Sequence, residues 1–556
     1  MTETNGSDTG IPIVIGVTGH RDLREQDIQM LRELVSNKLK QLMIQYPNSE
    51  FVMLNSIASG ADTLCARIAL ELGIKLICPL PLPIQEYRKD FSEPDAAIFD
   101  TLLKNASEVF LAPNTEPLPD CQIRDFHYRQ AGIYIAAHSH VLIALWDGMP
   151  AKPDGCGTAE TVDFMYRGYY GNGYGCFKAA NDGAVIHILT PRQSTKTDLS
   201  ISDHLLENET SSLRETLCMT DAFNADASKG DDRIAYAGVL LPEETMSNTD
   251  EKLKKLHMLY QKSDRLSLRF QQKYLSALRW FSVFGVLLVL FFLLYDELES
   301  NLFLLSYGAL IIVYVLAFTL VRRGNCHEKY LQYRMLSETL RVQFYLKATG
   351  MRDNIGNAFT WTQKQESTWI KEAVSALLIG EQSKHTVPVD AIKERWIDGQ
   401  LTYHQNAFKR DSSKHRMNEG IAKWMLAASL LLFLLVLVLE FFSDSAMTGS
   451  IFNPSFPILF LHHPEQELTL RSLMKLLLGG VSAITVFLAN YYGKLSFERK
   501  SIDHEKMTGL FSSAKEQFES GKIDKKQLFR ELAREEIIEN GNWFSYCREN
   551  PPSFNL

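Results

Sequence analysis

The sequence has no long block of basic residues, no Cys-X-X-Cys motif and no pair of histidines at the spacing of zinc ligands. With a net charge of −8 over 556 residues, we expect no nucleic acid among its partners. Its eight scattered cysteines predict reduced thiols in a cytosolic compartment and no metal site. Residues 1–10 lack the apolar core of a signal peptide, so we expect a disordered tail there and membrane insertion by internal segments.

Charged side chains are also absent from four apolar runs in the C-terminal half: Phe281–Leu294, Leu302–Val321, Met425–Leu439 and Leu476–Tyr492. A helix of about 20 residues spans a bilayer core, and about 17 can suffice. The second and fourth runs meet this length, and the first and third need their flanks, whose Lys and Arg heads can reach the interface. The alternative is a set of buried core helices in a large soluble domain.

Charges at the ends of the runs favour a membrane. Basic residues precede and follow each pair of runs, whereas the connection 296–301 carries three acids and no base. This fits the positive-inside rule with both termini cytoplasmic. Arg471 and Lys475 in the second connection do not fit it. We therefore predict a multi-pass protein of the cell inner membrane, with four transmembrane helices in two hairpins.

The N-terminal part alternates between apolar β-type runs and segments with helical spacing. Near-continuous apolar strands separated by helices predict a parallel sheet covered on both faces. We expect an α/β, Rossmann-like domain over 11–192, followed by an all-α membrane region. The expected strands are Ile11–Val17, Phe51–Ile57, Ile74–Pro79, Val109–Leu111, Val141–Ala144 and Val185–Leu189, and the expected helices are Asp27–Tyr46, Ala61–Leu72, Pro94–Asn105, Arg124–Ser139 and Thr158–Tyr166.

The remainder is expected to form a polar connecting region over 193–249 and two helical units with two membrane helices each, over 250–395 and 396–556. An internal repeat supports the two units. Trp280 and Trp424 open the first and third apolar runs, and two later matches share one offset of 174 residues. These matches pair Gln343–Phe344 with Gln517–Phe518, and Trp369 with Trp543.

Three glycine-containing loops follow predicted strands, and the first contains Gly16, Gly19, His20 and Arg21. In open α/β sheets, ligands bind at the carboxyl ends of strands, where this loop lies. Small residues allow a ligand to approach the backbone, and Arg21 is suited to a phosphate. The alternative is a tight turn with an Arg21–Asp22 ion pair.

The second loop contains Ser59, Gly60 and Asp62 and leads into a helix. Backbone N–H groups at a helix N-terminus bind anions, and the Asp62 carboxylate would complement the helix dipole. The alternative is simple N-capping by Ser59.

The third loop contains Gly157, Thr158 and Glu160. Gly157 and Thr158 suit phosphate or ribose contacts. Glu160 is the candidate catalytic residue, because a carboxylate can bind a ribose hydroxyl or act as base or nucleophile on a glycosidic carbon. The alternative is an ordinary glutamate at a helix start.

These loops, together with Arg129, resemble the SLOG superfamily, which includes Lonely Guy phosphoribohydrolases, the DNA-processing protein A fold and prokaryotic nucleotide sensors. The resemblance rests on GVTGHRD, SIASGADTLCARIALELG and GTAET after LIALWDG. It implies phosphate or ribose contacts from Gly19, Arg21, Ser59, Gly60, Gly157 and Thr158, and it places the glutamate of the family's GTxxE-type motif at or next to Glu160. The Lonely Guy pattern PGGxGT is PDGCGT here, which favours nucleotide binding over hydrolysis.

The membrane half resembles the SLATT group, in which two transmembrane helices precede a long cytosolic helix. This resemblance implies a bacterial anti-phage or conflict system in which a nucleotide or ADP-ribose-type signal triggers a membrane effector, as a pore formed by a homo-oligomer in the lipid bilayer. One alternative is a membrane-anchored enzyme acting on the N-glycosidic bond of NAD or nucleotides, with Glu160 assisted by Asp147 or His20. Another is a transporter with a regulatory first domain.

Overall fold

The computed structural model describes residues 10–119, 121, 123–151, 157–168, 183–194, 199–207, 212–229, 238–298, 301–380, 386–442, 450–452 and 468–550. The chain forms two compact units. The first combines the segment up to Ser267 with Leu331–Ile392 and Ile523–Glu549. The second contains Leu268–Tyr330 and Lys393–Lys522. Each unit therefore contains segments from several of the expected domains.

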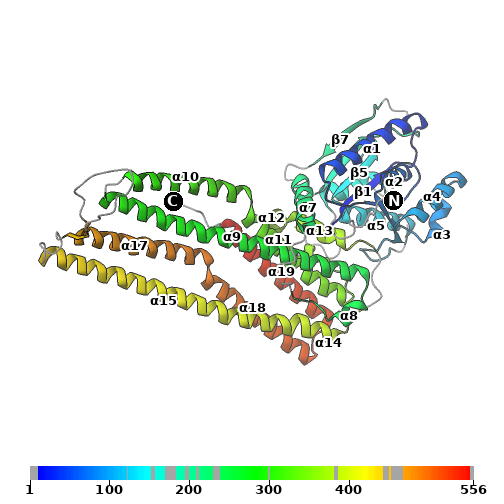
Figure 1. Ribbon diagram of the computed structural model, residues 1–556. Helices are drawn as coiled ribbons and strands as arrows, with labels where there is room; N and C mark the ends of the chain where they lie inside the picture. The colour runs from blue at the N-terminus through cyan, green and yellow to red at the C-terminus, as the bar shows by residue number, and fades with distance from the viewer. Residues whose placement is uncertain are drawn as a thin grey trace. The chain divides into compact units, whose positions relative to one another are not determined.

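The first unit contains a seven-stranded sheet with the order β4-β3-β2-β1-β5-β6-β7. Figure 1 labels its strands β1, β5 and β7. All neighbouring strands are parallel except β6 and β7. The predicted α/β class with a largely parallel sheet is thus confirmed. The strands are β1 (Ile13–Gly19), β2 (Phe51–Leu54), β3 (Lys75–Leu80), β4 (Glu108–Leu111), β5 (Val141–Trp146), β6 (Ala184–Leu189) and β7 (Ser202–Leu206).

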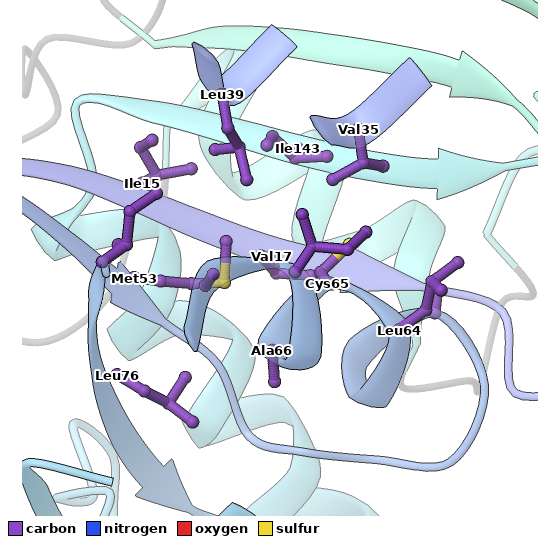
Figure 2. Close-up of a cluster of buried hydrophobic side chains, with 14 of the residues drawn as sticks. Ile15, Val17, Val35, Leu39, Met53, Leu64, Cys65, Ala66, Leu76 and Ile143 are labelled. Atoms are coloured by element: carbon purple, nitrogen blue, oxygen red, sulfur yellow. The ribbon is translucent and has the colours of Figure 1, made fainter. Parts of the chain in front are cut away.

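Helices cover both faces of this sheet, because alternate side chains of each strand point to opposite faces. Ile15 and Val17 of β1 belong to a core that also contains Val35 and Leu39 of α1 (Figure 2). Val14 belongs to a second core shared with α5 and α6. The helices of this part are α1 (Ile28–Gln45), α2 (Ala61–Glu71), α3 (Ile84–Tyr87), α4 (Glu93–Asn105), α5 (Ile123–His138) and α6 (Thr158–Arg167).

The strand order places a topological switch point between β1 and β5. The chain leaves β1 toward β2, β3 and β4, then returns through α5 to place β5 on the other side of β1. The carboxyl ends of the two strands lie side by side, with Gly19 paired with Leu145. Ligands of doubly wound sheets bind at such points.

The polar region after Arg192 contributes to the α/β fold. Its strand β7 extends the sheet at the edge. Asn224 of α7 (Leu213–Ser228) exchanges two hydrogen bonds with the backbone of Ile11, both 2.9 Å long. Asp221 accepts a hydrogen bond from the N–H of Asn48 at 2.8 Å. A short helix, α8 (Glu243–Ser247), follows.

A helical part completes the first unit around α11. Trp369 of α13 donates its indole N–H to Gln332 of α11 at 2.7 Å. Arg341 of α11 pairs with Glu536 of the last helix, α19, at 2.8 Å. Its helices are the start of α9 (Glu251–Leu298), α11 (Cys326–Ala348), α12 (Trp361–Glu366), α13 (Thr368–Leu377), α14 (Val389–Ile392) and α19 (Lys525–Glu549).

The second unit contains the apolar runs, in α9, α10 (Asn301–Arg323), α15 (Gly399–Phe442) and α17 (Leu470–Leu495), and also α18 (Phe497–Ser520). Within the described residues, four helices are long and apolar enough to cross a membrane. At most 17 % of each apolar window is buried. Core helices of a soluble domain would be largely buried, so the chain is a membrane-associated protein.

Glycines bring two of these helices close together. A Cβ on Gly285 of α9 would lie 2.2 Å from Phe487 of α17, and a Cβ on Gly479 would lie 2.7 Å from Leu293. Small residues that allow such an approach are typical of helix contacts in membranes.

Candidate functional site

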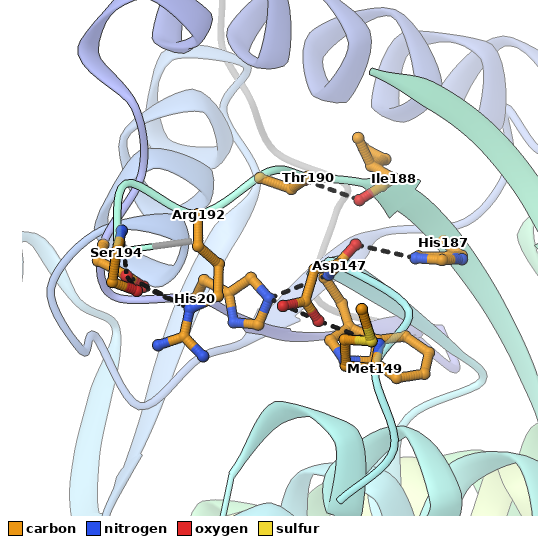
Figure 3. Close-up of polar contacts among 10 residues, drawn as sticks. His20, Asp147, Met149, His187, Ile188, Thr190, Arg192 and Ser194 are labelled. Atoms are coloured by element: carbon orange, nitrogen blue, oxygen red, sulfur yellow. Dashed lines mark hydrogen bonds and ion pairs between the residues drawn. The ribbon is translucent and has the colours of Figure 1, made fainter. Parts of the chain in front are cut away.

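The loop after β1 places His20 against the end of β5. The N–H of Asp147 donates to Nε2 of His20 at 2.9 Å, and the Asp147 carboxylate lies 3.2 Å from the same nitrogen (Figure 3). Burial lowers the pKa of His20, although the Asp147 charge opposes this effect. Because Nε2 accepts a backbone N–H, the neutral ring carries its proton on Nδ1.

Asp22 anchors this loop to the segment after β6, whose residues Arg192 and Ser194 are labelled in Figure 3. It accepts hydrogen bonds from Nε of Arg192 at 3.0 Å and from the N–H of Ser194 at 3.3 Å. Burial tends to raise the pKa of Asp22, but the bonds from Ser194 and Arg192 outweigh burial and lower it. Asp22 thus pairs with Arg192 and not with Arg21, whose guanidinium lies 5.2 Å from the ring centre of Tyr128.

The first and second loops touch through their backbones. Gly60 has a φ of 82°, and a Cβ there would lie 2.4 Å from the carbonyl oxygen of Arg21. Likewise, a Cβ on Gly19 would lie 2.3 Å from the Cβ of Ala61, so both glycines are required for this close approach. The N–H of Ala61 donates to the carbonyl of His20 at 3.0 Å.

The start of α2 differs from the simple capping interpretation. The N-cap residue is Gly60, with no side-chain cap, so Ser59 does not cap the helix. Asp62 is 6 % exposed, and burial raises its pKa to about 7, against a weaker lowering by the N–H of Ala58 and by Arg21. Asp62 is therefore partly protonated at neutral pH and complements the helix dipole only in part.

Glu160 and Arg129 form a second polar group. Nε of Arg129 lies 2.9 Å from Oε1 of Glu160, and its Nη1 lies 3.4 Å from Glu116. Burial raises the pKa of Glu160, while Arg129 opposes the effect. The other oxygen of Glu160 is buried and has no hydrogen-bond partner among the described residues. Such an oxygen can receive a proton or a ligand hydroxyl.

The third loop is only partly described. A Cβ on Gly157 would meet no atom of the described residues within 4 Å, so packing against these residues does not require a glycine there. Thr158 begins α6, and residues 153–156 of the motif lie outside the described residues. Gly16 contacts the other end of the sheet, where its Cβ would lie 2.5 Å from Ser139. Ser139 directly follows α5 and Ile135, 2.8 Å from the same Cβ, belongs to it, so Gly16 allows α5 to pack closely on β1.

The hydrogen bonds join the predicted residues into two groups, His20 with Asp147 and Arg129 with Glu160. Three partners were missed in the sequence: Asn55, Glu116 and Arg192. Asn55 accepts the N–H of Ile57 at 2.7 Å and holds that residue at a φ of 55°. Asn55 directly follows β2, but it lies inside the predicted strand Phe51–Ile57, and Arg192 and Glu116 come three and five residues after the ends of β6 and β4. A search for polar residues within five residues of the observed strand ends would have found all three. Within the described ranges, no cluster of His, Cys, Asp and Glu is suited to a metal ion.

Comparison with known proteins adds little to this geometry. No family model matches the chain, and no curated protein matches it. The chain is similar to the crystal structure of DNA processing protein A from Streptococcus pneumoniae, at 20 % identity over 27 % of this chain and 46 % of that protein. The match spans less than half of that protein. The TM-score is 0.19, too low to establish a shared fold.

Proposed function

We propose that this chain is a membrane effector gated by a nucleotide or an ADP-ribose-type ligand. The observation that carries the proposal is the position of the loops at the switch point between β1 and β5, in a chain that also has four candidate membrane helices. The ligand would contact Gly19, Arg21, Ser59, Gly60, Gly157 and Thr158, with Arg129 and Glu160 beside it.

The charges near the switch point support an anionic ligand. Arg21 is exposed and forms no ion pair among the described residues, so its charge is available to a phosphate. His20 is neutral, and Asp62, with a pKa raised to about 7, loses its negative charge on modest acidification. A phosphate is thus neither attracted nor repelled by the charge of the His20 ring, and repulsion from Asp62 falls as its carboxyl takes up a proton.

The output half would be the two hairpins, inserted in a bacterial inner membrane with both termini cytoplasmic. Ligand binding opens a path through the membrane only if the ligand binds the open arrangement of the hairpins more tightly than the closed one. Equal affinity for both arrangements would leave the equilibrium between them unchanged. Two hairpins are too few to enclose a wide pore, so the proposal requires a homo-oligomer. Defence against phage is the setting that the SLOG and SLATT resemblances imply.

A thermal-shift screen of the purified full-length protein against AMP, NAD, ADP-ribose and cyclic nucleotides tests the ligand site. A ligand that binds the folded state raises the melting temperature. The rise should disappear in Arg21→Ala and persist in Arg167→Ala, since Arg167 is exposed on α6 and pairs only locally with Asp163. A rise that survives both Arg21→Ala and Glu160→Ala would place the ligand elsewhere.

Leakage of a dye from liposomes containing the protein tests the output. The ligand from the screen should increase leakage in the wild type and have no effect in Arg21→Ala. Leakage that no nucleotide changes at millimolar concentration would contradict the gating.

The buried, unpartnered oxygen of Glu160 favours one second candidate, hydrolysis of an N-glycosidic bond. Glu160 would act as base or nucleophile on the anomeric carbon. The protein would then release free base from NAD, AMP or deoxynucleosides, and Glu160→Gln would not. Absence of released base with all three substrates would remove this candidate.

A further inference from the structure

A large cavity in the first unit borders the Arg129–Glu160 group, since the ring of its lining residue Phe164 lies 5.7 Å from the Arg129 guanidinium. Its volume is about 1170 Å³, and it lies between the α/β part and the helical part of the same compact unit. Tyr134 and Ala137 of α5 line one side, and Lys347 of α11 and Lys371 of α13 line the other. None of the residues predicted for the nucleotide site lines it. The volume suffices for a small organic molecule.

His140 gives this cavity an unsatisfied hydrogen-bond donor. The side chain lines the cavity, and the residue is 4 % exposed. Its Nδ1 accepts the N–H of Val14 at 3.0 Å, so the proton of the neutral ring is on Nε2. Burial lowers its pKa to about 4, so the ring is neutral at pH 7. Nε2 is buried without a hydrogen-bond partner among the described residues, a costly state that an acceptor atom of a ligand would relieve.

The charge in the cavity wall is positive on balance. The lining acid Asp353 already accepts two bonds from Arg530, at 2.7 and 3.1 Å, and Glu372 lies 3.2 Å from Lys371. Lys347 lines the cavity and forms no ion pair among the described residues, and burial lowers its pKa. The carboxylates of Asp250 and Glu108 oppose this lowering from beyond ion-pair distance, so an anion in direct contact with the half-buried ammonium would still be stabilised by its charge.

Part of the wall is apolar and aromatic. Phe110 and Tyr134 pack edge to face with ring centres 5.4 Å apart, and Phe164 and Met351 also line the cavity. An aromatic ligand body would pack well against such rings. The wall thus combines an apolar surface, a donor at His140 and a cation at Lys347.

We propose that this cavity binds a small organic anion with an aromatic body, at a site separate from the switch point. The ligand would contact α5 on one side and α11 and α13 on the other. The two sides already meet where the N–H of Gly380 donates to the hydroxyl of Tyr134 at 3.0 Å. A ligand here would stabilise the contact between the α/β part and the helical part, with or without a ligand at the switch point. The helix α5 also carries Arg129, so the cavity and the candidate site share this helix.

The test uses the full-length protein in detergent with 1-naphthoate and 1-naphthyl phosphate as probes, 1-naphthylmethanol as the uncharged analogue and inorganic phosphate as the anion alone. Both naphthyl anions should raise the melting temperature, and the uncharged analogue and phosphate should bind at least about tenfold more weakly. No effect of either naphthyl anion at millimolar concentration, or an equal effect of all four compounds, would overturn the proposal.

Variants locate the binding. Ala137→Phe fills the cavity without removing a hydrogen bond, and Lys347→Gln removes the cation, so each should weaken the probes by about tenfold or more. Lys89→Gln, on an exposed lysine of the α/β part, is the matched control and should leave them unchanged. Arg21→Ala should also leave them unchanged, so that failure of this proposal and failure of the nucleotide site are distinguishable.

A cryo-electron microscopy map with 1-naphthyl phosphate covers the case in which a variant fails to fold. Density for the probe beside His140 would support the proposal, and probe density only at the switch point or among the membrane helices would overturn it.

Discussion

Replacing Asp62 by asparagine should remove a pH dependence from the stability of the first unit. The Asp62 carboxyl is buried at the start of α2, and its pKa rises from 3.8 to about 7 on folding. The folded state therefore holds a proton that the unfolded chain releases. The stability that Asp62 contributes is fully present below pH 3.8 and is lost as the pH rises through 7.

The size of the effect follows from these two values. Each pH unit between them is worth about 1.36 kcal/mol, so the full loss is roughly 4 kcal/mol, of which roughly 2 kcal/mol falls between pH 5 and pH 7. Asparagine keeps an acceptor for the N–H of Ala58 and carries no charge. The free energy of unfolding of the variant should therefore rise relative to that of the wild type by roughly 3 kcal/mol from pH 5 to pH 8.

The buried thiol of Cys65, one turn further along α2, reports opening of this region. The rate at which maleimide labels Cys65 can be measured by mass spectrometry. When the region closes faster than the thiol reacts, this rate is proportional to the population of the opened state. The ratio of wild-type to variant rates cancels the intrinsic pH dependence of the thiol. This ratio should rise roughly a hundredfold from pH 5 to pH 8.

Asp163→Asn is the matched control, because Asp163 is exposed on α6 and its ion pair within the described part of the chain is with the nearby Arg167. The ratio of wild-type to Asp163→Asn labelling rates should stay constant with pH. A constant ratio for Asp62→Asn as well would show that Asp62 titrates in its ordinary range, and would refute the assignment of a half-protonated carboxyl at the switch point.

Three further predictions concern glycines and one ion pair. Gly60→Ala should lower the melting temperature more than Gly73→Ala. Both glycines have a positive φ, so alanine costs about 1–2 kcal/mol at either position, but only at Gly60 would the new Cβ also clash with a backbone carbonyl. Asp22→Asn should cost about 1 kcal/mol at pH 7 and nothing at pH 2 in acid unfolding, because a lowered pKa gives stability that is lost as the pH falls. Gly285→Leu should lower the melting temperature in detergent, whereas Gly308→Leu, with no atom within 4 Å of its Cβ, should not.

The six parallel strands could be predicted from the sequence because each is a short apolar run bounded by turn residues. The strand β7 was missed because its first three residues are Ser202, Asp203 and His204. An edge strand faces solvent on one side and needs no apolar run. Its identity comes from antiparallel pairing with β6, a contact between distant segments that local patterns do not encode.

The sequence predicts each loop of the candidate site by itself, but not the contacts between the loops. The glycines mark the turns, but the partner of His20 depends on β5 lying beside β1, which the sequence does not reveal. The same holds for Asp22, whose partner Arg192 lies 170 residues away. Sheet order decides which strand ends meet, and local propensity carries no information about it.

The position of α19 has a consequence for biosynthesis. This helix belongs to the first unit, yet it is translated after both apolar hairpins. At about 5–20 residues per second, the roughly 130 residues between the earlier segments of that unit and α19 take on the order of ten seconds to synthesise. During that interval Arg341, buried beside Glu536 in the finished protein, lacks this partner. The first unit can therefore be completed only after the ribosome has synthesised the last of the four candidate membrane helices.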